Sequence, residues 1–227
     1  MYREREVPGG TLWTRRADTA EVARVIPDGC LDLLWIRDEL VVAGPDTGPH
    51  LAATGAGEVI TGLRFASGRG PAVLGVPARE LRDARVPLAD LWAPGAVREL
   101  TERLAAARVP GRVLAEAVAG LRAEPDPIVP GVLASLAEGV PVADCARRTG
   151  LSERQLHRRS LDAFGYGLRT LSRVHRLGRA LELVRSGRPL AETAAVAGYA
   201  DQPHLTREVR ALTGVAPTAF APVSPAG

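Results

Sequence analysis

Two short stretches in the carboxyl-terminal half of the chain carry side chains that can read the edges of nucleic-acid bases. The first, residues 152–159, reads Ser-Glu-Arg-Gln-Leu-His-Arg-Arg, and the second, residues 201–207, reads Asp-Gln-Pro-His-Leu-Thr-Arg. Arginine presents two parallel donors to guanine, glutamine pairs with adenine, and the methyl group of threonine contacts thymine. The alternatives are that these side chains bind phosphate or only keep a helix surface hydrated. Both stretches have the chemistry needed to recognise a DNA groove.

A near-repeat predicts the elements that hold these two stretches. The segment Pro141–Ala146 followed by Gly150 recurs 48 residues later as Pro189–Ala194 followed by Gly198. Each copy predicts a short helix, then a glycine at a position of positive φ that other side chains disfavour, then a second helix. This order of elements is that of a helix-turn-helix unit. The sequence therefore predicts two such units.

Capping residues and apolar spacing define the second helix of each unit. Ser152 is followed three residues later by Gln155, which is a capping box, and Asp201 is a strong N-cap. Apolar residues recur at helical spacing after both caps and predict a buried stripe, so the remaining side chains face outward. The candidate DNA-binding residues are Ser152, Arg154, Gln155, His157, Arg158, Arg159, Asp201, Gln202, Pro203, His204, Thr206 and Arg207.

The segment between the two units predicts a single long helix. Apolar residues recur every three or four positions from Leu168 to Val184, which indicates an amphipathic helix of about eighteen residues. Arg169, Arg173 and Arg176 on its polar face are candidates for phosphate contacts, with a solvated face as the alternative. If this helix holds the two reading helices in successive major grooves on one side of the duplex, they should lie roughly 34 Å apart.

Residues 127–222 resemble the DNA-binding domain of AraC/XylS-type bacterial transcription regulators. The resemblance rests on Leu151–Arg159, on Phe164–Gly167, on Ala197–Arg207 and on the closing stretch Thr213–Phe220. It implies a sequence-specific transcription regulator whose two recognition helices enter successive major grooves. The partners that it implies are double-stranded promoter DNA, RNA polymerase and a second copy of the chain.

Several positions depart from that family. Ser160 stands where the family usually has a core aromatic residue, and Leu205 and Val209 stand where two more aromatic residues are common. Ala221 replaces the arginine that frequently follows the last aromatic residue. Because smaller side chains bury less apolar area, we expect a thinner core in the second unit.

The charge of the chain is concentrated in the same region. The 227 residues carry a net charge of +3, and all 29 basic residues are arginine. Residues 1–126 hold 16 arginines and 18 acidic residues, whereas residues 127–227 hold 13 arginines and 8 acidic residues. The carboxyl-terminal part therefore has a net charge of +5, which favours binding to a phosphate backbone.

The first hundred residues have a different pattern. Short segments rich in Val, Ile, Leu and Trp alternate with clusters of Gly, Pro and Asp, and from residue 76 onward the apolar spacing becomes helical. The predicted fold class is α+β, with an amino-terminal β-rich domain (a cupin-like barrel or sandwich) with a helical tail and a carboxyl-terminal all-α domain. The predicted strands are Glu21–Ile26, Cys30–Ile36, Leu40–Ala43, Glu58–Phe65 and Pro71–Leu74.

This order of elements is similar, more loosely, to AraC-type regulators in which a cupin-like barrel is followed by helices used in dimer contacts. The stretches Pro27–Cys30 and Gly62–Phe65 are similar to a sensor domain that recurs in this group. We predict a β-rich effector-sensing domain with its helical tail over residues 1–108, a helix or linker over 109–126, a DNA-binding domain over 127–222 and a disordered tail over 223–227. Glu124–Pro127 marks the domain boundary, because two prolines resist regular structure.

Four residues of the amino-terminal half are candidates for contact with a small-molecule effector: Asp32, Trp35, His50 and Arg64. Ordinary packing of Trp35, and a salt-bridged or solvated surface for Asp32 and Arg64, are the alternatives. Strand alternation places Asp32 on the face opposite Leu33 and Trp35. If the face of Asp32 points inward, its carboxylate needs a polar partner.

The sequence also excludes several classes of function. A cupin enzyme assembles a metal from two or three histidines and a carboxylate, and only His50 lies in the amino-terminal half, so we predict no metal, no cofactor and no catalytic residue. Cys145 is expected to pack in a core, and Cys30 is either a packed or a redox-sensing thiol. No apolar stretch approaches the ~20 residues that span a bilayer. We expect a cytoplasmic protein.

These observations favour an effector-responsive transcription regulator that is not an enzyme. The competing hypothesis is a small-molecule-binding protein, or a degenerate cupin-type enzyme, whose helical half is an interaction module. The two hypotheses differ in whether the chain binds duplex DNA with a sequence preference and a steep salt dependence.

Overall fold

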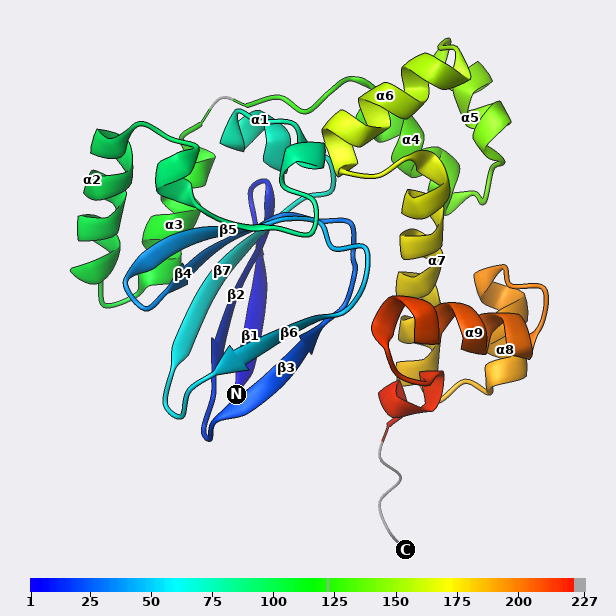
Figure 1. Ribbon diagram of the computed structural model, residues 1–227, viewed down its shortest axis with the longest axis horizontal. Helices are drawn as coiled ribbons and strands as arrows, with labels where there is room; N and C mark the ends of the chain where they lie inside the picture. The colour runs from blue at the N-terminus through cyan, green and yellow to red at the C-terminus, as the bar shows by residue number, and fades with distance from the viewer. Residues whose placement is uncertain (122, 223–227) are drawn as a thin grey trace, which may run out of the picture.

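The computed structural model describes residues 1–121 and 123–222 and contains two domains (Figure 1). The strands and the first helices form the amino-terminal domain, and the helices after residue 127 form the carboxyl-terminal domain. The tail predicted for residues 223–227 lies outside the described residues. Across the described part of the chain, no helix combines the length and apolarity that a membrane crossing needs.

The strands of the amino-terminal domain form two separate antiparallel sheets. The larger sheet has the order β1-β2-β7-β4-β5-β8, so β1 and β8 are its edges, and β3 pairs only with β6. The strands are β1 (Tyr2–Val7), β2 (Gly10–Arg16), β3 (Glu21–Val25), β4 (Asp32–Ile36), β5 (Glu39–Ala43), β6 (His50–Thr54), β7 (Val59–Phe65) and β8 (Arg85–Pro87).

Helices cover one face of the larger sheet, and the core of the domain lies between these helices and that face. Leu33, Trp35 and Leu63 are buried on this face, together with Leu100 from α2 and Leu114 from α3. The apolar residues that recur over residues 96–107 therefore pack inside the amino-terminal domain. Because α3 packs in this core, the segment predicted as helix or linker contributes to the amino-terminal domain. The elements after β7 are α1 (Gly70–Leu74), η1 (Ala78–Glu80), η2 (Leu88–Asp90), α2 (Pro94–Ala105) and α3 (Pro110–Ala119).

The fold class is confirmed, and some strand predictions are corrected. The prediction of a strand over Pro71–Leu74 is wrong: the segment is helix α1, which begins with a proline in its first turn and ends at Gly75 in the left-handed conformation. Strands β1, β2, β6 and β8 were not predicted. β1 is an exposed edge strand, so it has no apolar alternation to reveal it.

The carboxyl-terminal domain is built around one long helix. Helix α7 contributes Leu171 and Val174 to one cluster of buried residues and Leu177 and Leu181 to another. The first cluster holds α4 to α6 at one end of α7, and the second holds α8 and α9 at the other end (Figure 1). The elements are α4 (Ile128–Ala137), α5 (Val142–Thr149), α6 (Glu153–Phe164), α7 (Leu168–Arg185), α8 (Leu190–Ala197), α9 (Gln202–Thr213) and η3 (Pro217–Phe220).

The two domains are in direct contact. Helix α6 packs on η1 and α1 of the amino-terminal domain, and Arg79 forms an ion pair with Asp162 of α6. At the other end of the interface, Arg24 of β3 donates a 3.2 Å hydrogen bond to the backbone carbonyl of Thr213, at the end of α9. The amino-terminal domain thus touches both halves of the carboxyl-terminal domain.

Candidate nucleic-acid interface

Both predicted helix-turn-helix units are present. Helix α5 ends at Gly150 (φ 67°) and is followed by α6, and α8 ends at Gly198 (φ 83°) and is followed by α9. Glycine is required at both turns because a side chain strains a backbone of positive φ. Helices α6 and α9 are therefore the candidate recognition helices.

Three of the predicted interface residues cap these helices. The hydroxyl of Ser152 accepts a hydrogen bond from the Gln155 backbone N–H, and the Gln155 side chain accepts one from the Ser152 backbone N–H at 3.0 Å. Asp201 accepts a 2.6 Å bond from the backbone N–H of His204. These side chains position the first turns of α6 and α9.

Replacement of Ser152 by alanine is expected to destabilise the domain by about 1 kcal/mol, because the capping box of α6 is lost. The free energy of unfolding from chemical denaturation measures the effect. Ser152→Asp should restore stability, since aspartate is an equally good N-cap. If Ser152→Ala were as stable as the parent, the capping role would be wrong.

Five arginines on the described part of the domain are exposed and enter no ion pair, side-chain hydrogen bond or cation–π contact with the described residues. Two of them lie in the first half of α6, and one lies in the first half of α9 beside the exposed Gln202 and the half-buried Thr206. Unpaired guanidinium groups remain available to bases and phosphates. These arginines are Arg154, Arg158, Arg169, Arg207 and Arg210.

His157 lies beside these arginines, over the turn that follows α6. It is exposed, and a Cβ added to Gly167 would lie 2.5 Å from the His157 ring. Gly167 therefore leaves the space in which this ring lies.

Arg159, another candidate, is bound within the protein. Its Nε donates to Asp126 Oδ2 at 3.0 Å and its Nη2 to Oδ1, so the guanidinium and carboxylate form a two-point pair. Asp126 also accepts a 2.9 Å bond from the Ile128 backbone N–H at the start of α4. Burial acts to raise the pKa of Asp126, but the bonds from Arg159 and Ile128 outweigh it and hold the pKa below its usual value. Arg159 therefore joins α6 to the segment between the domains.

Arg173 and Arg176 are also paired, in this case with Glu208 of α9. The Arg176 Nη2 lies 2.7 Å from Glu208 Oε1, and the Arg173 Nε lies 3.5 Å from Oε2. His204 Nε2 lies 3.6 Å from the same Oε2. Of the three candidates for phosphate contact on α7, Arg169 alone has no partner among the described residues.

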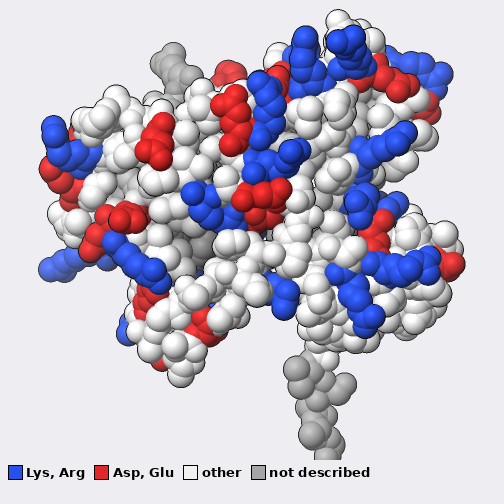
Figure 2. Space-filling model, viewed as in Figure 1, with Lys and Arg blue, Asp and Glu red and all other residues white. Residues whose placement is uncertain are grey.

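The surface charge follows this division. Figure 2 shows acidic and basic side chains interspersed on the amino-terminal domain, whereas arginines outnumber acidic side chains over the carboxyl-terminal domain. This distribution favours contact between the carboxyl-terminal domain and a polyanion.

A separate cavity of about 930 Å³ lies between the two sheets and α7. The face of β4 opposite the core lines it, and Asp32, Arg64 and His50 are among its lining residues. Trp35, the fourth candidate, lies on the other face of β4 in the core. The structure thus brings three of the four predicted effector residues to one cavity. Val174, His175 and other residues of α7 close its far side, a contribution that the sequence did not reveal.

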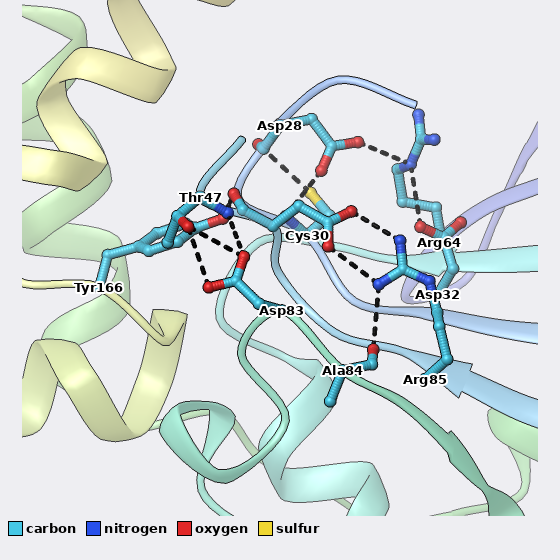
Figure 3. Close-up of polar contacts among 10 residues, drawn as sticks. Asp28, Cys30, Asp32, Thr47, Arg64, Asp83, Ala84, Arg85 and Tyr166 are labelled. Atoms are coloured by element: carbon cyan, nitrogen blue, oxygen red, sulfur yellow. Dashed lines mark hydrogen bonds and ion pairs between the residues drawn. The ribbon is translucent and has the colours of Figure 1, made fainter. Parts of the chain in front are cut away.

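One wall of this cavity holds a cluster of charged groups. Arg64 lies between Asp28 and Asp32, with its Nε 3.0 Å and 3.6 Å from their carboxylates (Figure 3). Trp13 Nε1 donates a 2.7 Å hydrogen bond to Asp32. Burial raises the pKa of Asp32 above its usual value, and Arg64 acts against this shift. The inward-facing carboxylate therefore has the polar partners that its burial requires.

Burial also disfavours the redox hypothesis for Cys30. Burial raises the pKa of its thiol, and the nearby carboxylate of Asp28 raises it further. Reactive cysteines instead have a lowered pKa, since the thiolate is the nucleophile. Cys145 is buried in the core of the first unit, as the sequence predicted.

A polar contact joins the amino-terminal domain to the first helix-turn-helix unit. The hydroxyl of Tyr166, in the turn between α6 and α7, donates to the backbone carbonyl of Asp46 (Figure 3). The Asp46 carboxylate accepts bonds of 2.9 Å and 2.7 Å from Arg85 on β8. The contact links the turn after a candidate recognition helix to the amino-terminal sheet.

The geometry of α5 to α9 agrees with a comparison against known protein families. The model of a helix-turn-helix domain matches residues 145–221. The carboxyl-terminal domain belongs to the AraC-type helix-turn-helix family. A domain of this type indicates a DNA-binding transcription regulator. A domain of unknown function (DUF6597) matches residues 11–87. No curated protein matches the chain.

Two crystal structures of ToxT share the overall fold of the chain. A crystal structure of an apo ToxT variant from Vibrio cholerae is 12% identical, with 96% of this chain and 98% of that chain covered and a TM-score of 0.52. Another ToxT structure from Vibrio cholerae is 10% identical, with 96% of each chain covered and a TM-score of 0.51. The carboxyl-terminal domain of AraT, a response regulator from Geobacillus stearothermophilus, is 23% identical over 42% of this chain and 84% of that chain, with a TM-score of 0.39.

Proposed function

We propose that the chain recognises a specific DNA sequence by placing α6 and α9 in successive major grooves. The observation that carries this proposal is that Arg154, Arg158 and Arg207 are exposed and have no partner among the described residues. They lie in the first halves of two capped helices that one long helix joins. In helix-turn-helix proteins, residues near the start of the recognition helix contact base edges. One protomer then covers two unlike half-sites.

A titration onto duplex DNA from the region upstream of its own gene tests this proposal, at two salt concentrations and with random duplex as competitor. Specific binding should survive the competitor and weaken steeply with salt, because phosphate contacts release counterions. Selection of bound sequences from a random library covers a target elsewhere in the genome. Failure to enrich any sequence, with or without added metabolites, would favour the small-molecule-binding hypothesis.

The same proposal includes control by a small molecule in the 930 Å³ cavity. The support for it is that both domains line the cavity: Asp32 and Arg64 come from the sheet, and Val174 and Gly178 come from α7. A ligand there would touch the helix that spaces the two recognition helices. It could therefore change DNA affinity by favouring one arrangement of the domains.

Gly178→Leu is expected to reduce binding of the fluorescent dye anilinonaphthalene sulfonate, which joins apolar rings to an anionic sulfonate, and to reduce any change in DNA affinity that the dye causes. A Cβ at Gly178 would meet no atom within 4 Å, so the new side chain can enter the cavity without a clash. Gly178→Ala is the matched control, and it should stabilise α7 by about 0.5–1 kcal/mol. Equal dye binding by the leucine variant and its control would place the dye site elsewhere.

A further inference from the structure

Glu208 occupies an unusual position on the second candidate recognition helix. Its side chain is only 10% exposed, although it is charged and lies on α9, the helix that carries Arg207. It contacts three cationic or titratable side chains: Arg173 and Arg176 of α7 and His204 of α9. A single carboxylate therefore connects the long helix to the recognition helix.

Arg176 contacts both the turn before α9 and Glu208, so it fixes how the two helices are connected. Its guanidinium lies 4.6 Å from the ring centroid of Tyr199, at the turn between α8 and α9, while its Nη2 binds Glu208. The Tyr199 ring in turn meets the His204 ring edge-on at 5.3 Å. His204 Nδ1 accepts a 3.3 Å bond from the Ala200 backbone N–H. These contacts fix the start of α9 against the side of α7.

The pair with Arg173 has a different consequence. Arg173 is 43% exposed, and Arg169, one turn earlier on α7, is exposed and has no partner among the described residues. Both lie between the two recognition helices, where a phosphate backbone would pass in the proposed complex. Because a carboxylate and a phosphate compete for the same guanidinium donors, the ion pair with Glu208 opposes phosphate binding by Arg173.

We infer that Glu208 is a specificity-determining positioning residue: it orients α9 against α7 and withholds Arg173 from the DNA backbone, which limits sequence-independent affinity. The inference rests on the proposed DNA recognition. Phosphate contacts raise affinity for every duplex equally, so withholding one favours discrimination between sequences.

The test is Glu208→Gln, which keeps the shape and an acceptor oxygen but removes the charge. Affinity for random duplex should rise, and the slope of log K against log salt should steepen by about one, from Arg173. Arg176 should contribute little, because it keeps its stack on Tyr199. The ratio of specific to random affinity should fall. Glu192→Gln is the matched control, since Glu192 of α8 pairs with Arg188, which precedes that helix, and is 61% exposed.

Double variants separate this role from a general change in charge or stability. Arg173→Ala should leave the salt slope of the parent unchanged, but should cancel the added slope when combined with Glu208→Gln. The inference would be overturned if Glu192→Gln and Glu208→Gln gained affinity equally. It would also be overturned if Arg173→Ala alone lowered the salt slope of the parent. Elution from heparin gives a second readout: Glu208→Gln should need more salt than Glu192→Gln. Failure of the parent to bind any duplex would count against the proposed function, while the heparin comparison would still test Glu208.

Discussion

Replacement of Arg158 or Arg207 by alanine is expected to weaken binding to the preferred duplex by about 1–3 kcal/mol, which is roughly 5- to 150-fold. Both guanidinium groups are exposed and unpaired among the described residues, so their removal breaks no internal contact and stability should stay within ~0.5 kcal/mol of the parent. Each variant should also lose sequence preference at one position of its half-site. Fluorescence anisotropy with a set of single-base variants of the site measures both effects.

Arg210→Ala is the matched control for these variants. Arg210 is exposed and, like Arg207, has no partner among the described residues, but it lies in the last turn of α9 and not in its first half. Its loss should weaken specific and random duplexes alike, through the loss of positive charge. If Arg158→Ala and Arg207→Ala changed specific binding no more than Arg210→Ala does, neither residue would belong to the interface.

The largest effect on stability is expected at Gly165, which ends α6 against the amino-terminal domain. Its φ of 76° disfavours any other residue, and a Cβ would lie 2.5 Å from Pro45 Cγ and 3.2 Å from the Ala78 carbonyl oxygen. Gly165→Ala should therefore cost about 1–2 kcal/mol for the backbone conformation and a further 1–3 kcal/mol for the steric overlap.

Gly150→Ala isolates the first of these two costs. Gly150 has a similar φ of 67°, and a Cβ there would meet no atom within 4 Å. Chemical denaturation of the two variants, monitored by fluorescence, gives the difference in their free energies of unfolding. We also expect the domains of Gly165→Ala to unfold in separate steps, because the overlap lies at their interface. Equal destabilisation in both variants would mean that the interface moves aside at no cost.

The sequence predicted the carboxyl-terminal domain well because its signals are local. Ser152 with Gln155, Asp201 and the glycines at 150 and 198 act within one or two turns of a helix, and all take the predicted roles. The same reasoning assigned capping residues to the interface list as well. Ser152, Gln155 and Asp201 therefore have a structural role within the protein, and their contact with DNA stays a prediction.

The pairs that modify the interface could not be predicted, because their partners are distant in the sequence. Arg176 and Glu208 are 32 residues apart, Arg159 and Asp126 are 33 apart, and Tyr166 and Asp46 are 120 apart. No spacing rule connects such residues; the packing of the two domains brings them together. Strand β6 could not be predicted for a different reason. It pairs with β3 in an exposed two-stranded sheet, so it has little apolar alternation to mark it as a strand.

Strand β1 has a consequence for self-association. It is an edge of the larger sheet, with Arg3 and Arg5 on one face and Glu4 and Glu6 on the other. If two copies paired these edges around a two-fold axis, each residue would lie opposite the same residue of the other copy or one an even number of positions away. Arginine would then face arginine, and glutamate would face glutamate. Like charges opposite one another destabilise such pairing. The alternating charges therefore disfavour growth of a continuous sheet from this edge, and we expect a symmetric dimer to form through another surface.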